Sequence, residues 1–301
     1  MSAPPAAGLP AVRALAVLAL VFNAFTWGVS WWPFRQLQDQ GLHPLWLTAL
    51  AFWAAVAVLL ASRPGALATL WRTRSLWVLV AAAGTTNACF NWAVTIGDVV
   101  RVVLLFYLMP LWAVLLARGL LGERISARGG LRVGLALLGA VVVLWPAEGG
   151  WRALLAAPAL ADALALLGGF SFALNNVMLR REAHTDASAR ALAMFLGGAL
   201  VATVLAGLLS QGGLAPWPPA PAPGWLLGAL ALTAWFLASN LALQYGAARL
   251  PANTTSVVML TEVLFASLSA LALGAGLLDG RTALGAALII GAALLASVQR
   301  D

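Results

Sequence analysis

Long apolar runs recur from one end of the chain to the other, and they constrain its fold more than any other feature. Each run spans about 17 to 25 residues and is separated from the next by a polar segment. With 62% hydrophobic and 9% charged residues and a mean hydropathy of +0.94, the chain has too few polar residues to cover a water-soluble fold. The sequence therefore predicts an all-α integral membrane protein.

We expect ten transmembrane helices, joined mostly by short connections, so that consecutive helices are antiparallel neighbours. The expected ranges are 14–32, 44–61, 75–96, 99–117, 131–147, 159–179, 191–209, 224–247, 251–273 and 282–298. The connection over residues 211–224 is rich in Gly and Pro and is expected to form an external loop.

The arginines predict the orientation of these helices. With the N-terminus inside, 13 of the 17 basic residues flank helix ends on the cytoplasmic side, and Arg35, Arg101, Arg152 and Arg281 lie on the other side. By the positive-inside rule, both termini of this multi-pass protein should face the cytoplasm, below a bacterial cytoplasmic (inner) membrane. Because the arginines are scattered between apolar runs, the net charge of +7 does not indicate binding to nucleic acid.

The two halves of the chain, residues 1–150 and 151–301, show weak internal similarity. An offset of 152 pairs Leu116 with Leu268, Leu121 with Leu273, Gly122 with Gly274, Gly139 with Gly291 and Ala140 with Ala292. A shift of one more residue pairs Asn87 with Asn240 and Trp92 with Tyr245. Because five helices per half is an odd number, the second half must enter the membrane from the opposite side. We therefore predict two inverted five-helix repeats, an arrangement typical of transporters that work by alternating access.

Three segments resemble a known family. Residues 92–124 (WAVTIGDVVRVVLLFYLMPLWAVLLARGLLGER), 162–181 (DALALLGGFSFALNNVMLRR) and 256–274 (SVVMLTEVLFASLSALALG) are similar to the EamA-type repeats of the drug/metabolite transporter superfamily. The Trp-rich first half and the chain length are most similar to its bacterial aromatic amino acid exporters. The resemblance implies export of aromatic and other apolar amino acids from the cytoplasm, with multidrug or other metabolite export as the alternative.

Glu262 is the first candidate for a functional side chain, because it lies near the centre of an expected span. An acidic group there costs about 2 to 3 kcal/mol or more to insert. It either contacts a substrate amine or takes up a proton in the cavity, or it is a neutral or helix-bonded group between packed helices.

Amides form the second group of candidates. Asn23, Asn87, Asn91, Asn175, Asn176 and Asn240 all fall inside expected spans. An amide in hydrocarbon needs hydrogen-bond partners, which a substrate or a neighbouring helix can supply. We favour Asn87 and Asn240 as cavity-lining residues, because the repeat relates them and Asn91 follows Asn87 by one helical turn.

Aromatic residues form the third group. Trp27, Trp92, Tyr107, Trp112 and Tyr245 lie well inside spans and are expected either to box an apolar side chain or to fill the core. The other tryptophans near span ends, such as Trp31 and Trp32, are expected to be interface anchors. Pro110 should kink its helix near Phe106, as a gating hinge or a static bend.

Other classes of function find little support. Zinc-site, phosphate-loop and hydrolase motifs are absent, and the two histidines, His43 and His184, fall in connections, so we expect no metal and no cofactor. Transport should then be secondary, with a small molecule as partner and a proton as a second partner if transport is proton-coupled. A membrane enzyme or a channel is the weaker interpretation. Asp98, Arg101 and Asp162 fall at helix ends, where solvation explains them, although Asp162 lies slightly inside. The small residues Ala266, Ala270 and Gly274 form a seam within a monomer or between two protomers.

Overall fold

The computed structural model describes residues 8–122, 127–145, 159–247, 249, 258–259, 261–275 and 279–297. These residues form helices and short connections, with no strand among them. In the first half the helices are α1 (Gly8–Val29), α2 (Trp31–Asp39), α3 (Pro44–Ser62), α4 (Gly65–Arg72), α5 (Ser75–Ile96), α6 (Val99–Phe106), α7 (Met109–Leu121) and α8 (Ala127–Leu144). In the second half they are α10 (Leu160–Arg181), α11 (Ala187–Gln211), α12 (Pro223–Ala247), α14 (Thr261–Ala272) and α15 (Gly280–Ser297).

Six stretches of the described chain are long and apolar enough to cross a membrane. They are Val12–Asp39, Pro44–Ser62, Val99–Leu120, Leu160–Leu179, Ala187–Gln211 and Pro223–Leu243. Two shorter apolar helices, Thr261–Ala272 and Gly280–Gly291, accompany them. Each of the ten expected ranges contains helix, but the prediction of ten spans goes beyond these six, and it stays a prediction.

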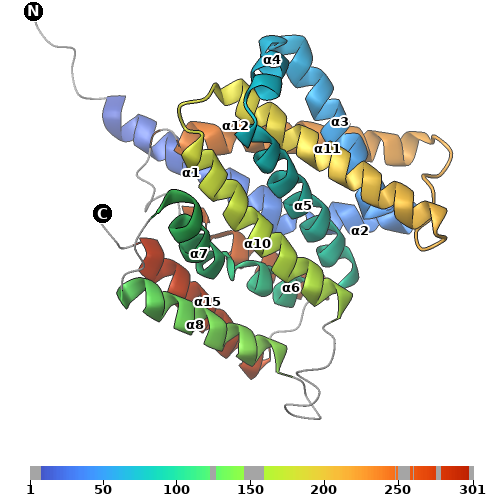
Figure 1. Cartoon of the computed structure of the whole chain (residues 1–301). Coiled ribbons are helices and arrows are strands. Elements are labelled where there is room, and N and C mark those ends of the chain that lie inside the picture. Colours follow the sequence, from blue (N-terminus) through green and yellow to red (C-terminus); the bar gives the residue numbers. More distant parts are fainter. Residues whose placement is uncertain are drawn as a thin grey trace, which may run out of the picture.

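The central helix, α5, is an expected span that is not among these six. It is as long as a span but carries Thr85, Thr86, Asn87 and Asn91, which lower its hydropathy. It packs against α3, α10 and α11, and Figure 1 shows it in the middle of the bundle. Because protein rather than lipid surrounds most of α5, polar side chains are tolerated there.

Small residues set the closest helix contacts. Where α5 crosses α11, the backbones of Gly84 and Gly197 approach so closely that a Cβ on Gly197 would collide with the carbonyl oxygen of Val80. Where α8 lies beside α15, a Cβ on Gly139 would come within 2.9 Å of the Gly285 carbonyl oxygen. Without a hydrophobic driving force between helices in lipid, close backbone approach of this kind supplies much of the packing energy.

Helices of the first and second halves pack on each other in reciprocal pairs. α1 packs on α12 and α14, while α10 packs on α5 and on α6 and α7. α3 pairs with α11, and α8 pairs with α15 (Figure 1). The bundle is therefore held together largely by contacts between halves, and neither half forms a separate core.

Two of the expected spans are broken in the structure. Ser30 separates α1 from α2, and Tyr107 and Leu108 form a turn between α6 and α7. Pro110 falls in the first turn of α7, where a missing backbone N–H costs least. Because proline has no N–H, the Phe106 carbonyl is left without an α-helical donor. The predicted kink near Phe106 is thus a complete break, and the role of Pro110 as a gating hinge stays a prediction.

His43 caps the helix that follows it. Its Nδ1 accepts a hydrogen bond from the Leu45 N–H at 3.3 Å, and its ring meets Trp92 edge to face with centroids 5.7 Å apart. Burial lowers the pKa of His43 below its ordinary value of 6.5, because the charged imidazolium is harder to desolvate. Protonation would also remove the acceptor that caps α3.

The crossing of α5 and α11 gives the first prediction. Gly197→Ala should lower the free energy of unfolding by about 1 to 3 kcal/mol, because the new methyl group collides with rigid backbone. Thermal unfolding in detergent would measure the change. Gly207→Ala on the same helix is the control, since nothing lies within 4 Å of a Cβ there. Equal melting temperatures for the two variants would contradict the close crossing.

The second prediction concerns the His43 cap. Because folding lowers the pKa of His43, this imidazole takes up a proton at a higher pH in the unfolded chain than in the folded protein. The stability that neutral His43 contributes is therefore complete above about pH 6.5 and is lost as the pH falls below that value. His43→Asn keeps a capping acceptor that does not titrate, so its unfolding temperature should change less than wild type between about pH 7.5 and about pH 5.5. His184→Asn, at an exposed turn, should follow wild type. An identical pH response in all three proteins would refute the assignment.

Candidate functional site

A hydrogen bond between the two halves lies at the centre of the candidate site. The Tyr107 hydroxyl, in the turn between α6 and α7, lies 2.9 Å from Oε2 of Glu262 in the first turn of α14. The same hydroxyl lies 3.2 Å from the Met259 carbonyl oxygen. Both side chains are buried, with exposed fractions of 3% for Tyr107 and 7% for Glu262. The hydrogen bond from Tyr107 of the other half offsets part of the free energy needed to bury the Glu262 carboxyl group.

The Tyr107 hydroxyl has one proton and two acceptors within reach, so it cannot donate to both at once. With Glu262 ionised, donation to the carboxylate is the stronger bond. With Glu262 protonated, the carboxyl can donate to the hydroxyl oxygen and leave the hydroxyl proton to the Met259 carbonyl. The contact between the two halves therefore depends on the protonation state of Glu262.

Aromatic rings connect this pair to the first helix. Trp27 of α1 stacks on Phe236 of α12 at 4.9 Å and meets Phe90 of α5 edge to face at 6.4 Å. Phe90 contacts Phe106 at 4.9 Å, and Phe106 lies 6.3 Å from Tyr107. We name Trp27, Phe90, Phe106, Tyr107 and Phe236 the aromatic chain. It runs through four helices and ends at Glu262.

The other predicted aromatic residues lie elsewhere. Trp92 packs beside His43, and Trp112 meets Phe170 of α10 at 5.6 Å. The buried Nε1 of Trp112 has no hydrogen-bond partner among the described residues. Tyr245 lies under the guanidinium of Arg249, 3.8 Å from its ring centroid. The structure thus brings Trp27 and Tyr107 into one chain of contacts, while Trp92, Trp112 and Tyr245 stand outside it.

The predicted amides differ in whether they bond to a neighbouring helix or to their own. Asn23 donates to the Ser239 hydroxyl at 2.7 Å, and Asn91 donates to the Thr48 hydroxyl at 3.0 Å, so both tie helices together. Asn87 donates to the Ala83 carbonyl of its own helix at 2.8 Å. Asn240 is partly buried on α12. Within the described part of the chain, the Oδ1 atoms of Asn23 and Asn91 are buried and lack a partner, so each retains an acceptor.

Asn175 is a candidate amide that the sequence did not lead us to favour. Its side chain is buried, with 2% exposed, and its Oδ1 has no partner among the described residues, whereas Asn176 is exposed. Asn175 is also related to Asn23 by the offset of 152. That relation was visible in the sequence, and it pairs two buried amides that each present an unpartnered oxygen.

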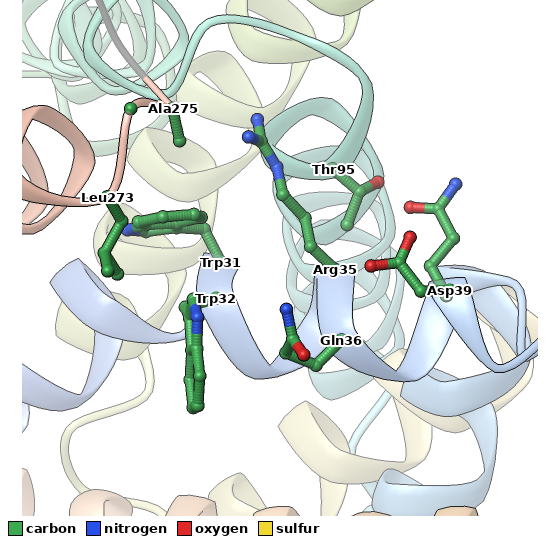
Figure 2. A pocket seen from close by; sticks show the side chains of 10 residues that line it. Trp31, Trp32, Arg35, Gln36, Asp39, Thr95, Leu273 and Ala275 are labelled. Carbon is green, nitrogen blue, oxygen red and sulfur yellow. The ribbon is translucent and has the colours of Figure 1, made fainter.

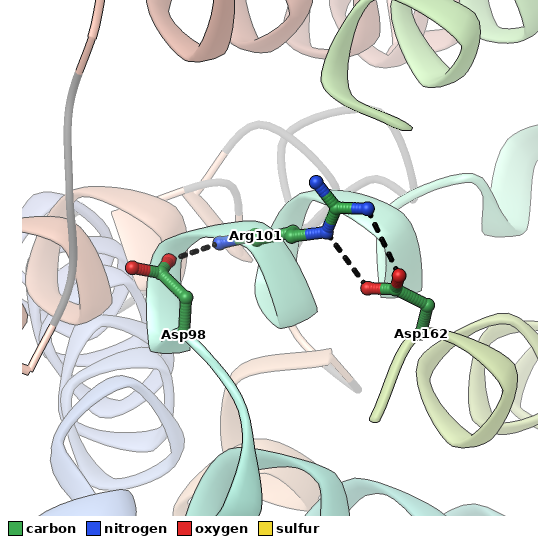
Figure 3. Close-up of polar contacts among 3 residues, drawn as sticks. All are labelled: Asp98, Arg101 and Asp162. Atoms are coloured by element: carbon green, nitrogen blue, oxygen red, sulfur yellow. Dashed lines mark hydrogen bonds and ion pairs between the residues drawn. The ribbon is translucent and has the colours of Figure 1, made fainter. Parts of the chain in front are cut away.

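An ion pair joins the halves near one end of the bundle (Figure 3). Arg101 of α6 donates from Nε and Nη2 to the two carboxylate oxygens of Asp162 on α10, at 2.8 and 2.9 Å. Asp98 caps α6 by accepting from the Arg101 backbone N–H at 2.8 Å. Asp162 is only 5% exposed, so solvation alone does not explain it, and the fork geometry gives a strong, directional contact.

Comparison with known proteins matches the first half of the chain to a transporter family. Residues 14–145 match the EamA-like transporter family. This match includes Asn23, Trp27 and Tyr107, and it supports the drug/metabolite transporter superfamily, whose EamA members are membrane transporters rather than enzymes.

The fold is shared over nearly the whole length with a protein of known structure. A crystal structure of a protein with 21% sequence identity covers 94% of this chain, and the chain covers 96% of that one, with a TM-score of 0.57. No curated protein matches the sequence. These comparisons support an EamA-type transporter over residues 14–145 and show a shared fold over nearly the whole chain.

The ion pair gives the third prediction. Asp162→Asn should lower the free energy of unfolding in detergent by about 1 to 3 kcal/mol, because the guanidinium loses a charged partner between packed helices. Adding Arg101→Gln should restore part of that loss, which a double-mutant cycle measures. Asp279→Asn is the matched control, since Asp279 lies 3.9 Å from Arg281 with both side chains exposed, and it should change little. Strict additivity of the two substitutions would show that the pair contributes nothing.

Proposed function

We propose that this protein is a secondary transporter that exports aromatic and other apolar amino acids across the bacterial cytoplasmic membrane by alternating access. The observation that carries the proposal is the Tyr107–Glu262 hydrogen bond, which joins the break between α6 and α7 in the first half to α14 in the second and lies at the end of an aromatic chain. The direction of transport comes from the family. No metal or cofactor enters the mechanism.

Two inverted five-helix repeats, over residues 1–150 and 151–301, are part of the proposal. The reciprocal helix pairs support it, because exchanging the halves converts the packing of α1 on α12 and α14 into that of α10 on α5 and α6. Gly122 and Gly274, paired by the offset of 152, both have positive φ, 72° and 66°. Tyr107 and Met259 are related by the same offset and touch, as residues beside a pseudo-two-fold axis should.

The chemistry of the site favours amino acids over larger anions. One buried carboxylate can pair with an ammonium group, buried amide oxygens can accept its hydrogen bonds, and the aromatic chain offers ring faces to an apolar side chain. A polyanion would meet the Glu262 carboxylate without a compensating cation among the residues of the aromatic chain.

A second candidate function rests on Glu262 itself. A carboxylate buried next to aromatic rings also suits a lipophilic cation, which pairs with the charge and stacks on the rings. Multidrug export by the same fold is therefore the alternative, and the transport assay below is designed to separate the two.

In the proposed cycle, proton binding at Glu262 changes the contact between the halves. Ionised Glu262 accepts the bond from Tyr107 of the first half, protonation reverses the direction of that bond, and a substrate ammonium competes for it. A substrate with an ammonium group would thus loosen the link that must break when the halves rock. The bilayer, the substrate and the proton are the only partners required, and a monomer is sufficient.

The fourth prediction is made for purified protein in liposomes preloaded with radiolabelled phenylalanine, threonine or a lipophilic cation. Wild type should release phenylalanine faster than threonine, and a pH gradient should change the rate. Glu262→Gln should remove the dependence on the gradient and slow phenylalanine efflux by about tenfold or more, since glutamine keeps the size of the side chain but can neither carry a charge nor take up a proton.

Two controls accompany this assay. Tyr107→Phe should keep the dependence on pH but shift its midpoint, because the carboxylate remains and loses its donor. Glu182→Gln replaces a carboxylate outside the pair, which accepts a local hydrogen bond from the Thr185 hydroxyl at 3.0 Å, and should behave as wild type. Release of the cation without release of any amino acid would reject the amino acid function in favour of drug export.

A further inference from the structure

A polar cavity of about 430 Å³ lies at one end of the bundle, where α2, α5 and α14 end (Figure 2). Its walls include Trp31, Trp32, Arg35, Asp39, Thr95 and Leu273. The volume is within the range of sites that take a small molecule. The distribution of arginines predicts that this end faces away from the cytoplasm.

Arg35 is fixed in position at this cavity. Its Nε and Nη2 donate to the Val94 carbonyl at 3.1 and 2.9 Å, and Nη2 also donates to the Gly97 carbonyl at 2.6 Å. The guanidinium carbon lies 5.1 Å from the centroid of the Trp31 ring. Within the described part of the chain Nη1 makes no hydrogen bond, so two N–H donors remain for an anion on a group that is already ordered.

Asp39 lies one helical turn beyond Arg35, on the same face of α2. Its exposed carboxylate makes no hydrogen bond or ion pair with the other described residues, but it lies close enough to Arg35 for the two charges to attract each other. A positive donor group and a negative acceptor thus lie about one turn apart, beside the indoles of Trp31 and Trp32 (Figure 2). This spacing suits a ligand that carries a carboxylate and an ammonium group on the same carbon atom.

We propose that this cavity is a binding site for a zwitterion with an aromatic side chain, the carboxylate of which binds Arg35 and the ammonium group of which binds Asp39. The indole of Trp32, which is 48% exposed, contacts the ring, while the buried Trp31 supports Arg35 from below. The site rests on the proposed function, as the place where an exported amino acid pauses before release. Trp32 then has a role beyond that of an interface anchor.

Its position relative to the aromatic chain supports this role. Trp31 follows Trp27 by four residues, and both pack in the core cluster that contains Tyr107 and Val263. The Trp31 indole N–H donates to the Ser269 hydroxyl of α14 at 3.0 Å, so the cavity wall is attached to the helix that carries Glu262. A substrate leaving the aromatic chain toward this end would meet the cavity next.

A lipid head group with an ammonium and a phosphate has related chemistry, so the test separates the two sources. Binding of tritiated L-tryptophan to purified protein in detergent would be measured in competition with indole-3-propionate, tryptamine and short-chain phosphatidylethanolamine. We expect tryptophan to bind at least about tenfold more tightly than either singly charged analogue. No saturable tryptophan binding, with labelled short-chain phosphatidylethanolamine binding in its place, would overturn the proposal.

Asp39→Asn is the deciding variant, because its side chain is exposed and its loss should not affect folding. It should weaken tryptophan binding by about tenfold and leave indole-3-propionate binding unchanged, since only tryptophan carries the ammonium group. Trp32→Ala should weaken both, and Asp279→Asn, another exposed carboxylate, should change neither. Equal tryptophan affinity in Asp39→Asn and wild type would reject the site.

The result can be separated from that of the transport assay. Amino acid efflux that persists while Asp39→Asn binds normally would reject the cavity site and leave the proposed function intact. Binding that depends on Asp39 in a protein that releases no amino acid would reject export and keep the cavity as an amino acid site.

Discussion

Inside a bilayer no water is present to satisfy backbone polar groups, and most features of this protein follow from that constraint. Regular helices satisfy the backbone internally, so each place where a helix breaks needs a protein partner. Around the break at Tyr107 and Leu108 the neighbouring segments are buried, and Gly169 of α10 comes so close that a Cβ there would lie 2.5 Å from the Phe106 carbonyl oxygen. The carbonyl that Pro110 leaves without a donor is thereby covered by backbone rather than lipid.

The same constraint explains why polar contacts join the halves. Trp31 with Ser269, Asn23 with Ser239 and Arg101 with Asp162 each connect a helix of one half to a helix of the other. Such bonds add little energy where the alternative partner is another protein group, but they fix which helices meet. Close packing, through residues such as Gly84 and Gly197, then holds the arrangement together.

The helices could be predicted from the sequence because hydropathy and helix length are local properties. The break near Pro110 was predictable for the same reason, and so was Glu262, an acidic residue in an apolar run. The partners were not: nothing local shows that Glu262 meets Tyr107, that Trp27 joins the aromatic chain or that Trp92 does not. Asn175 and Asn176 could not be told apart in the sequence, because a difference of one residue, or about 100° on a helix, separates a buried side chain from an exposed one.

The distribution of charge gives a physical reason for two binding sites, one at Glu262 and the aromatic chain and one in the cavity at Arg35 and Asp39. Among the residues of the aromatic chain and their partner Glu262 only one side chain can carry a charge, so a zwitterion there leaves its carboxylate to hydrogen bonds alone. The cavity at Arg35 and Asp39 offers both charges, but it lies at the end of the bundle, where water screens them and weakens binding. A substrate would therefore be held in the interior by its ring and ammonium group, and its carboxylate would find a cation only after leaving. A modest gain at an exposed site draws the substrate outward without trapping it.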